Sequence, residues 1–284
     1  LLIRMGIINR ILPKRLKPIS RDIGFTINSC IYKLNCIGKK PHSSPIFILG
    51  NQKSGTSAIA ALLGELSGKD TAIDLYYSGF RYSHFKDWKR GKLNTKQFIN
   101  KNKIEFSFEI LKEPHFSVFF KELKQEFIEA KFVMIVRDPL DNIRSILDRL
   151  NIDGDKKNLE KEDKKKIFHS WNLLFNNDWI GGSKKQYIEV LAERWNIISK
   201  TYLENKNNII LVKYEDFLKD KIKVINNLSR ELNIEKVNDI SSLLNTQFQP
   251  VGKNKKVDVQ EFFKEKNYQK ILSICKENME RLVY

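Results

Sequence analysis

Five short apolar runs alternate with amphipathic segments along the chain. The runs cover residues 46–49, 71–75, 106–111, 132–136 and 209–212, and the run at 132–136 is continuous, as in a buried parallel strand. Between the runs, apolar residues recur every three or four positions, which is typical of helices. Strands alternating with amphipathic helices predict an α/β domain of three layers, in which helices cover both faces of a mostly parallel central sheet.

Helices are predicted wherever the apolar spacing is three to four residues. One begins at Thr56, directly after a polar loop, and another begins at Pro139, because proline is tolerated in the first turn of a helix. The other predicted helices cover residues 95–103, 116–130, 167–179, 184–203, 218–232, 239–244 and 259–282.

Two segments depart from this pattern. Residues 76–91 are rich in aromatic and cationic side chains, and we expect an irregular segment that either lines a ligand cleft or caps the core with its aromatic rings. Residues 151–166 are strongly charged and are predicted to form an exposed loop or flap.

Residues 1–44 precede the α/β pattern and are expected to form a basic arm or helical extension of the domain at 45–284. The first 35 residues mix apolar side chains with cations, but Pro13 and Pro18 interrupt them and no secretory cleavage site follows. The arm is predicted either to pack on its own domain or to touch a membrane surface as a basic amphipathic segment.

Charge and cysteine content add weak constraints. Lys and Arg number 51 against 34 Asp and Glu, a formal net charge of +17. This excess favours anionic partners, although lysines scattered over solvated faces explain it equally well. The three cysteines, Cys30, Cys36 and Cys275, lack metal-ligand spacing, and their odd number fits a reduced, cytoplasmic setting. No apolar run approaches the roughly twenty residues of a membrane helix.

A polar loop with two glycines separates the first apolar run from the first helix. Gly50 and Gly55 have the separation found in a Walker A loop, and Thr56 and Ser57 stand where that motif has its Lys and Ser or Thr. The lysine stands inside the loop instead, at Lys53. A loop between a strand and a helix N-terminus directs several N–H groups at one anion. The segment therefore predicts a phosphate site that differs from that of a nucleoside triphosphatase.

Polar residues also follow the other apolar runs, and a parallel sheet binds its ligands at such strand ends. Asp74 ends the second run, residues 112–115 follow the third, and Arg137 follows the fourth. A magnesium-dependent NTPase would have an acid where Arg137 stands, and Asp138 is expected to cap the next helix. Ser145 follows Arg137 by eight residues, so this pair is suited to binding a second phosphate.

These motifs, in this order, resemble those of the PAPS-dependent sulfotransferases, whose donor is 3′-phosphoadenosine 5′-phosphosulfate (PAPS). Residues 50–57 resemble the loop that binds the 5′-phosphosulfate, and residues 132–145 resemble the motif that binds the 3′-phosphate. Residues 112–114, Lys-Glu-Pro, are similar to the Lys-x-Pro element of the family, and residues 211–217 are similar to an element containing Tyr-Glu-Asp. The resemblance extends from about residue 45 to residue 256.

The resemblance implies a role for each matching residue. Lys53 would contact the oxygen that bridges sulfur and the 5′-phosphate, where it neutralises charge on the leaving group. The residues that would hold the 5′-phosphate are Ser54, Gly55, Thr56 and Ser57. Arg137 and Ser145 would bind the 3′-phosphate, and Lys253, in a basic turn, would approach the same phosphate. The product of the donor is adenosine 3′,5′-bisphosphate (PAP), and no metal ion is expected.

An in-line displacement at sulfur also needs a base beside the acceptor. The family uses a carboxylate in some branches and a histidine in others. Asp74 stands roughly where the carboxylate branches have their base, and it is the first choice. His115 stands roughly where the histidine branch has its base, and Glu113 and His84 are further alternatives.

The expected function is transfer of a sulfuryl group from PAPS to a hydroxyl or amine of a saccharide, glycan or small metabolite, without nucleic acid as a partner. Residues 76–92 and 151–182 would form the acceptor walls. One alternative is a P-loop nucleotide kinase or NTPase, which the spacing of Gly50 and Gly55 favours. Another is an anion-binding module without activity, which the net charge favours.

Overall fold

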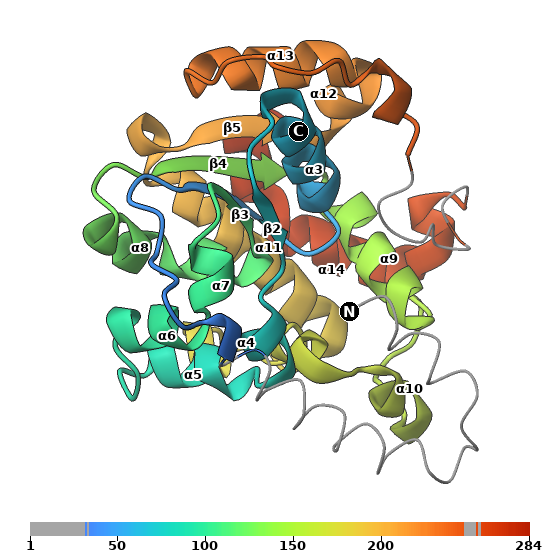
Figure 1. Ribbon diagram of the computed structural model, residues 1–284. Coiled ribbons are helices and arrows are strands. Elements are labelled where there is room, and N and C mark those ends of the chain that lie inside the picture. The colour runs from blue at the N-terminus through green and yellow to red at the C-terminus, as the bar shows by residue number, and fades with distance from the viewer. Residues whose placement is uncertain (1–31, 33, 247–253, 255–256) are drawn as a thin grey trace, which may run out of the picture. The chain divides into compact units, whose positions relative to one another are not determined.

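The structure is a computed structural model that describes residue 32, residues 34–246, residue 254 and residues 257–284 (Figure 1). The chain forms two compact units, residues 1–40 and residues 41–284. Most of the predicted basic arm lies outside the described residues, as does Lys253. The remaining description concerns the second unit.

Five parallel strands form one sheet in the order β2-β3-β1-β4-β5. The strands are β1 (Ile46–Gly50), β2 (Thr71–Ile73), β3 (Ile110–Lys112), β4 (Lys131–Val136) and β5 (Ile210–Lys213). The chain runs from β1 toward β2 on one side and later crosses to β4 on the other. The carboxyl end of β1 is therefore the switch point at which a parallel sheet of this kind binds its ligands.

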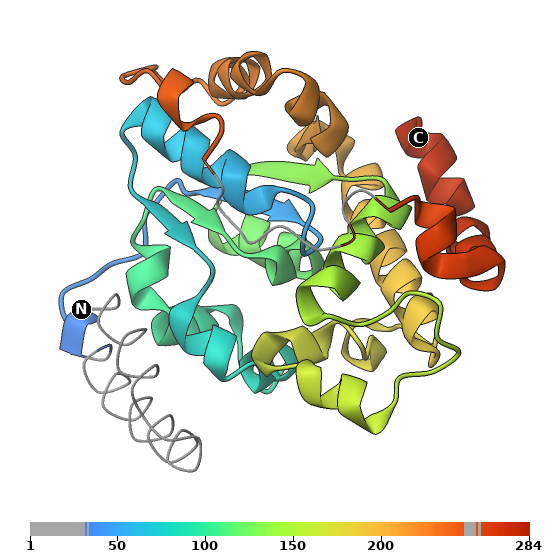
Figure 2. The same ribbon diagram turned by 90° about the vertical axis from the view of Figure 1, so that its right-hand side faces the viewer.

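Helices and short 3₁₀ turns connect the strands, as Figures 1 and 2 show, and the helices predicted at 116–130 and 239–244 are partly or wholly 3₁₀ turns. The helices are α3 (Thr56–Ser67), α4 (Tyr76–Phe80), α5 (Ser83–Lys89), α6 (Thr95–Lys101), α7 (Lys103–Phe106), α8 (Phe120–Glu126), α9 (Pro139–Leu150), α10 (Lys161–Lys166), α11 (Tyr187–Leu203), α12 (Tyr214–Lys219), α13 (Lys221–Glu231) and α14 (Val259–Leu282). Short 3₁₀ turns are η1 (Pro114–Phe119), η2 (His169–Leu173), η3 (Asp178–Ile180), η4 (Lys206–Asn208) and η5 (Ser241–Leu243).

Alternation along the central strand separates two cores. Ile46 and Ile48 of β1 pack in a cluster with residues of α3, α12 and α13, whereas Phe47 and Leu49 pack in a larger cluster with residues of α8, α9, α11 and α14. All four side chains are buried. This period of two places a helical layer on each face of the sheet, and the predicted three-layer α/β fold is confirmed.

Two predicted elements around the third strand differ from the structure. The strand expected at 106–111 is confined to β3, because Phe106 ends helix α7 and packs its ring against Phe47 and Phe116. Its apolar character reflects this aromatic core rather than strand pairing. Residues 76–91, expected to be irregular, form α4 and α5, and the buried Phe85 and Trp88 lie on one side of α5.

The segment before α11 differs as well. The helix expected at 167–179 is replaced by η2 and η3, because the buried Leu173, Leu174 and Trp179 come from successive turns and not from one helical face. The charged segment 151–166, expected to be a loop, contains α10, and its Asp163 is buried and ion-paired with Lys156 and Lys166. The helix expected at 218–232 is divided into α12 and α13 at Asp220.

Candidate active site

The loop between β1 and α3 is shaped by two glycines. Gly50 has a φ of 147°, and a Cβ there would lie 2.6 Å from the carbonyl oxygen of Ile135. Gly55 has a φ of 93° and caps α3, and a Cβ there would lie 2.4 Å from the ring of Tyr214. Only glycine fits both positions. Lys53 adopts a left-handed φ of 67° between them, which turns this residue away from the path of an ordinary strand or helix.

Side chains from two other elements hold this loop. Asn142 of α9 is fully buried, accepts a hydrogen bond from Nδ2 of Asn51 at 2.8 Å and donates one to the carbonyl of Gln52 at 2.9 Å. The hydroxyl of Ser117 in η1 accepts from the backbone N–H of Gly50 at 2.9 Å. Ser54 donates its hydroxyl back to the carbonyl of Asn51 at 2.6 Å. The loop is thus fixed before any anion binds.

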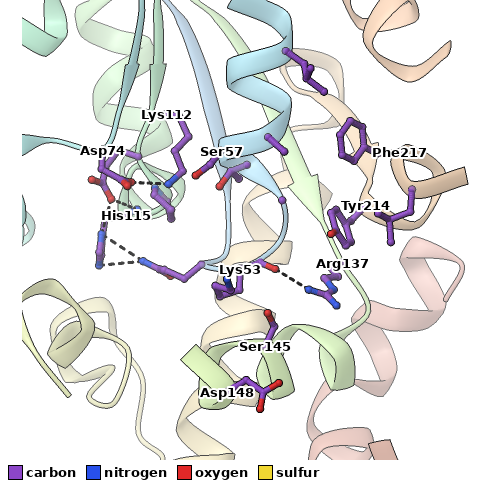
Figure 3. Close-up of a pocket in the computed structure, with 18 of the residues that line it drawn as sticks. Lys53, Ser57, Asp74, Lys112, His115, Arg137, Ser145, Asp148, Tyr214 and Phe217 are labelled. Carbon is purple, nitrogen blue, oxygen red and sulfur yellow. Dashed lines mark hydrogen bonds and ion pairs between the residues drawn. The ribbon is translucent and has the colours of Figure 1, made fainter. Parts of the chain in front are cut away.

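Arg137 lies at the end of β4 beside this loop. Its Nη1 donates to the carbonyl of Lys53 at 3.0 Å, and its guanidinium lies over the ring of Tyr214, 4.7 Å from the centroid (Figure 3). The indole N–H of Trp195 donates to the Arg137 carbonyl at 2.8 Å. These contacts direct the guanidinium along the edge of the predicted phosphate loop, residues 50–57.

Helix α9 begins directly after Arg137. Asp138 caps it by accepting hydrogen bonds from the N–H groups of Leu140 and Asp141, as the sequence predicts, and burial raises the pKa of the Asp138 carboxyl. Ser145 follows two turns along the helix. Figure 3 shows Ser145 on the side of α9 that faces Lys53 and Arg137, so the two positions expected to bind one phosphate lie across the same opening.

The candidate base Asp74 follows β2 with a left-handed φ of 64°. Its carboxylate forms an ion pair of 2.6 Å with Lys112, and its N–H donates to the Lys112 carbonyl at 2.7 Å. The surrounding protein partly desolvates the carboxyl and raises the pKa of Asp74, Lys112 acts in the opposite direction, and the side chain remains 53% exposed. Asp74 is therefore a carboxylate at the cavity surface that is already engaged with a cation.

The other candidate base, His115, is buried and borders the cavity. Its Nδ1 lies 2.7 Å from Oε1 of Glu113, and its ring stacks on Phe85 with centroids 4.6 Å apart. Burial lowers the pKa of His115. Burial acts to raise the pKa of Glu113, but the neighbouring His115 and Lys112 outweigh it and leave the pKa of that carboxyl below its usual range. The pair is best described as a neutral imidazole beside a carboxylate.

These groups border one cavity of about 510 Å³ (Figure 3). The predicted site residues that line it are Lys53, Gly55, Thr56, Ser57, Asp74, His115, Arg137 and Ser145. Ser54 is buried and does not line it, and Lys253 lies outside the described residues. Other lining residues that the sequence did not single out include Gln52, Arg144, Asp148, Trp171, Phe217 and Lys221.

The sequence pointed to the positions of these missed residues only in part. Arg144 precedes Ser145 on α9, so the same helix that suggested Ser145 also brings a second cation to the cavity. Phe217 belongs to the segment with Tyr-Glu-Asp, but nothing in its position reveals that its side chain borders the ligand space. The sequence places Gln52 in the loop but does not predict where its side chain points, because that direction depends on the fold.

The cavity is electropositive at the phosphate loop. Burial, followed by repulsion from Arg149, Arg137 and Lys112, lowers the pKa of Lys53 from 10.5 to about 8. A bound anion would relieve this repulsion and restore the charge of Lys53. Among the described residues, no group of three or more His, Cys, Asp or Glu is arranged to hold a metal ion.

Comparison with known proteins shows the family to which the chain belongs. Residues 43–279 match the family described as the sulfotransferase domain, and the chain belongs to this family. The mouse sulfotransferase SULT7A1 complexed with PAP is similar in structure with a TM-score of 0.51 and 15% identity, over 86% of this chain and 88% of the mouse chain. Sulfotransferase STF9 from Mycobacterium avium has a TM-score of 0.49 and 12% identity, over 91% of this chain and 81% of its own. No curated protein sequence matches the chain.

The predicted enzyme class, a PAPS-dependent sulfotransferase, is therefore confirmed at the level of the family. The spacing of Gly50 and Gly55 that suggested a nucleotide kinase or NTPase belongs to a sulfotransferase loop instead. No helix in the described part of the chain combines the length and apolar character that crossing a membrane requires.

Proposed function

We propose that the protein transfers a sulfuryl group from PAPS to a hydroxyl or amine of a small-molecule acceptor, and that the cavity holds both substrates. The observation that carries this proposal is the continuity of the cavity. It joins the phosphate loop and Arg137 at one end to Asp74 and His115 at the other. A volume of about 510 Å³ suits a nucleotide together with part of an acceptor.

The donor would lie between the phosphate loop and α12. Lys53 and the N-terminus of α3, with Thr56 and Ser57, would bind the 5′-phosphosulfate, because N–H groups at a helix start attract anions. Arg137 and Ser145 would bind the 3′-phosphate. Adenine would fit the part of the cavity lined by Tyr214, Phe217, Leu218, Leu62 and residues 244–246, where aromatic and aliphatic side chains meet.

The acceptor would enter at the other end. Trp171, Leu174 and Pro114 give this end apolar surface, and Asp74 and His115 give it polar groups. This composition suits a saccharide, glycan or small metabolite that presents both a ring face and hydroxyl or amine groups.

The transfer would be an in-line displacement at sulfur. The acceptor oxygen or nitrogen forms a bond to sulfur while the bond from sulfur to the 5′-phosphate oxygen breaks, and the electron pair stays on the phosphate as PAP leaves. Lys53 would stabilise the charge that develops on that oxygen. The acceptor proton would pass to a base at the same time.

Of the two candidate bases, we propose that His115 takes the proton and that Asp74 orients Lys112. Glu113 accepts the Nδ1 proton of His115, which leaves the Nε2 lone pair for the acceptor. The Asp74 carboxylate is bound to Lys112 at 2.6 Å. His115→Asn is expected to lower kcat by about a hundredfold or more, and Asp74→Asn by less. A larger loss of kcat in Asp74→Asn than in His115→Asn would instead identify Asp74 as the base.

The proposal is tested by ligand binding and by donor turnover. Arg137→Ala is expected to weaken PAP binding by about tenfold or more while weakening adenosine 5′-monophosphate much less, because only PAP has a 3′-phosphate. Lys53→Ala is expected to abolish transfer from ³⁵S-labelled PAPS to the acceptor pool of a cell extract. Tight binding of ATP with magnesium and no binding of PAP would refute the proposal.

A further inference from the structure

Gln52 links the phosphate loop to the proposed base. Its backbone is fixed within the loop, because its N–H donates to Oδ1 of Asn51 at 3.0 Å and its carbonyl accepts from Asn142 at 2.9 Å. The residue is only 8% exposed to solvent. Its side chain extends along the edge of the cavity to His115. Its Nε2 lies 3.2 Å from Nε2 of His115 and 3.5 Å from Nδ1, so the amide nitrogen lies over the face of the imidazole ring.

The hydrogen-bond pattern fixes which way the Gln52 amide faces. The ionised carboxylate of Glu113, 2.7 Å from Nδ1 of His115, can only accept, so the imidazole proton lies on Nδ1. Nε2 of a neutral imidazole is then an acceptor whose lone pair lies in the ring plane. The electron-rich face of the ring attracts the NH₂ group of Gln52 and repels a carbonyl oxygen, so the Gln52 carbonyl oxygen points away from the ring.

This carbonyl oxygen, Oε1, is buried and has no hydrogen-bond partner in the part of the chain that the structure describes. Buried carbonyl oxygens are almost always satisfied, because leaving one unpaired is unfavourable. Gln52 borders the cavity next to His115, so a molecule bound at the acceptor end can reach this oxygen. The missing partner is thus a donor inside the cavity, either a water molecule or a group of a bound ligand.

We infer that Gln52 is an acceptor-binding residue, which holds His115 through its amide nitrogen and receives a hydrogen bond from the acceptor through Oε1. The inference rests on the proposed function. When the acceptor enters, its attacking X–H group donates to Nε2 of His115 in the ring plane, while the Gln52 amide stays over the ring face. A second donor of the acceptor pairs with Oε1.

This pairing defines a class of acceptor. During transfer the X–H bond breaks and its proton forms a bond to Nε2 of His115, the X–S bond forms, and the S–O bond to PAP breaks with its electron pair on the phosphate. Oε1 needs a further donor at or beside X. A neutral primary amine or a vicinal diol provides one, as does water, whereas an isolated phenolic hydroxyl has only the proton that it transfers.

The substitution Gln52→Met tests the inference, because methionine has a similar length and no hydrogen-bonding amide. Gln125→Met, at an exposed position of α8, is the matched control. PAP affinity is measured first by calorimetry and is expected to change less than about twofold in either variant, since the Gln52 side chain points toward His115. Failure of the wild-type protein to bind PAP would contradict the proposed function itself.

The state of His115 is measured next by ¹⁵N NMR on protein with labelled histidines, of which the chain has four. His115→Asn assigns the signal. The wild-type protein is expected to show a proton on Nδ1 and none on Nε2, and Gln52→Met is expected to shift the signals of both ring nitrogens, because the amide group over the ring is lost. A proton on Nε2 in the wild type, or unchanged ring signals in the variant, would overturn the inference.

The role of Oε1 is measured with water as the acceptor. Slow release of labelled sulfate from PAPS is expected in the wild-type protein and the control, and Gln52→Met is expected to lower it by about tenfold, the effect of losing one hydrogen bond in the transition state. Methylamine and ethylene glycol should compete with water better than methanol does, because both offer a second donor. A wild-type rate equal to that of buffer, or an unchanged rate in the variant, would refute acceptor binding by Gln52.

Discussion

Lys53 is surrounded by cations before any ligand binds. Burial contributes most to lowering its pKa to about 8, and Arg149, Arg137 and Lys112 add repulsion. Such a site favours a bound anion, because the anion replaces repulsion with attraction. The same arrangement destabilises the ligand-free protein, so this residue connects the proposed chemistry directly to folding stability.

The destabilisation caused by the charge of Lys53 is expected to depend on pH. The folded pKa of Lys53, about 8, lies below the unfolded value of 10.5, so retaining the proton is unfavourable only in the folded state. The resulting loss in the free energy of unfolding is complete below pH 8, and it disappears as the pH rises from there toward 10.5. After allowance for partial exposure, Lys53→Met is expected to raise the free energy of unfolding by about 1 kcal/mol near pH 7.

Urea unfolding of the ligand-free protein near pH 7 and near pH 10 measures this effect. The gain from Lys53→Met should shrink at the higher pH. Lys96→Met, at an exposed position of α6, is the control and should leave stability unchanged at both values. A Lys53→Met variant that is less stable than wild type near pH 7 would contradict the prediction.

At the scale of elements, the phosphate loop depends on helix α9. Asn142 satisfies both the side chain of Asn51 and the carbonyl of Gln52, and it is fully buried. The same helix presents Ser145 to the cavity. One helix thus holds the proposed 5′-phosphosulfate loop in shape and contributes to the proposed 3′-phosphate site, which fixes the position of one site relative to the other.

The second prediction concerns this dependence. Asn142→Ala would leave a buried amide and a buried carbonyl without partners, which is expected to cost about 1–3 kcal/mol of stability. PAP affinity should fall as well, because the loop is then no longer fixed before binding. Denaturant titration and calorimetry measure the two effects. Asn158→Ala, at an exposed position, is the control, and equal behaviour of the two variants would count against a role of Asn142.

The elements also show how far the sequence could predict this molecule. Motifs at strand ends, such as Arg137 after β4, were placed correctly because a parallel sheet gathers its strand ends. The strand at 106–111 and the helix at 167–179 were wrong, because an apolar spacing does not reveal whether its residues face a strand neighbour, a helix or a turn. The contact of Gln52 with His115, 63 residues apart, depends on side-chain directions that no local pattern contains.

At the scale of the whole molecule, the net charge of +17 is not spread evenly over the cavity. Among the described lining residues, Lys53, Arg137, Arg144 and Lys221 at the proposed donor end outnumber the one acid, Asp148. At the acceptor end of the same lining, Asp74 and Glu113 outnumber the one described cation, Lys112. Global repulsion and a local anion site are therefore separate sources of salt dependence. The first responds to ionic strength alone, and the second responds to the kind of anion.

The last prediction separates these two sources. Sodium chloride should raise the melting temperature modestly by screening the +17 charge. Sulfate at the same ionic strength should raise it further, by about 2–4 °C, since an anion that binds the folded state stabilises it by mass action. In Arg137→Ala the excess effect of sulfate should shrink while the chloride effect remains, because one charge of many is removed. Equal effects of the two salts in the wild-type protein would mean that the loop and Arg137 do not form an anion site.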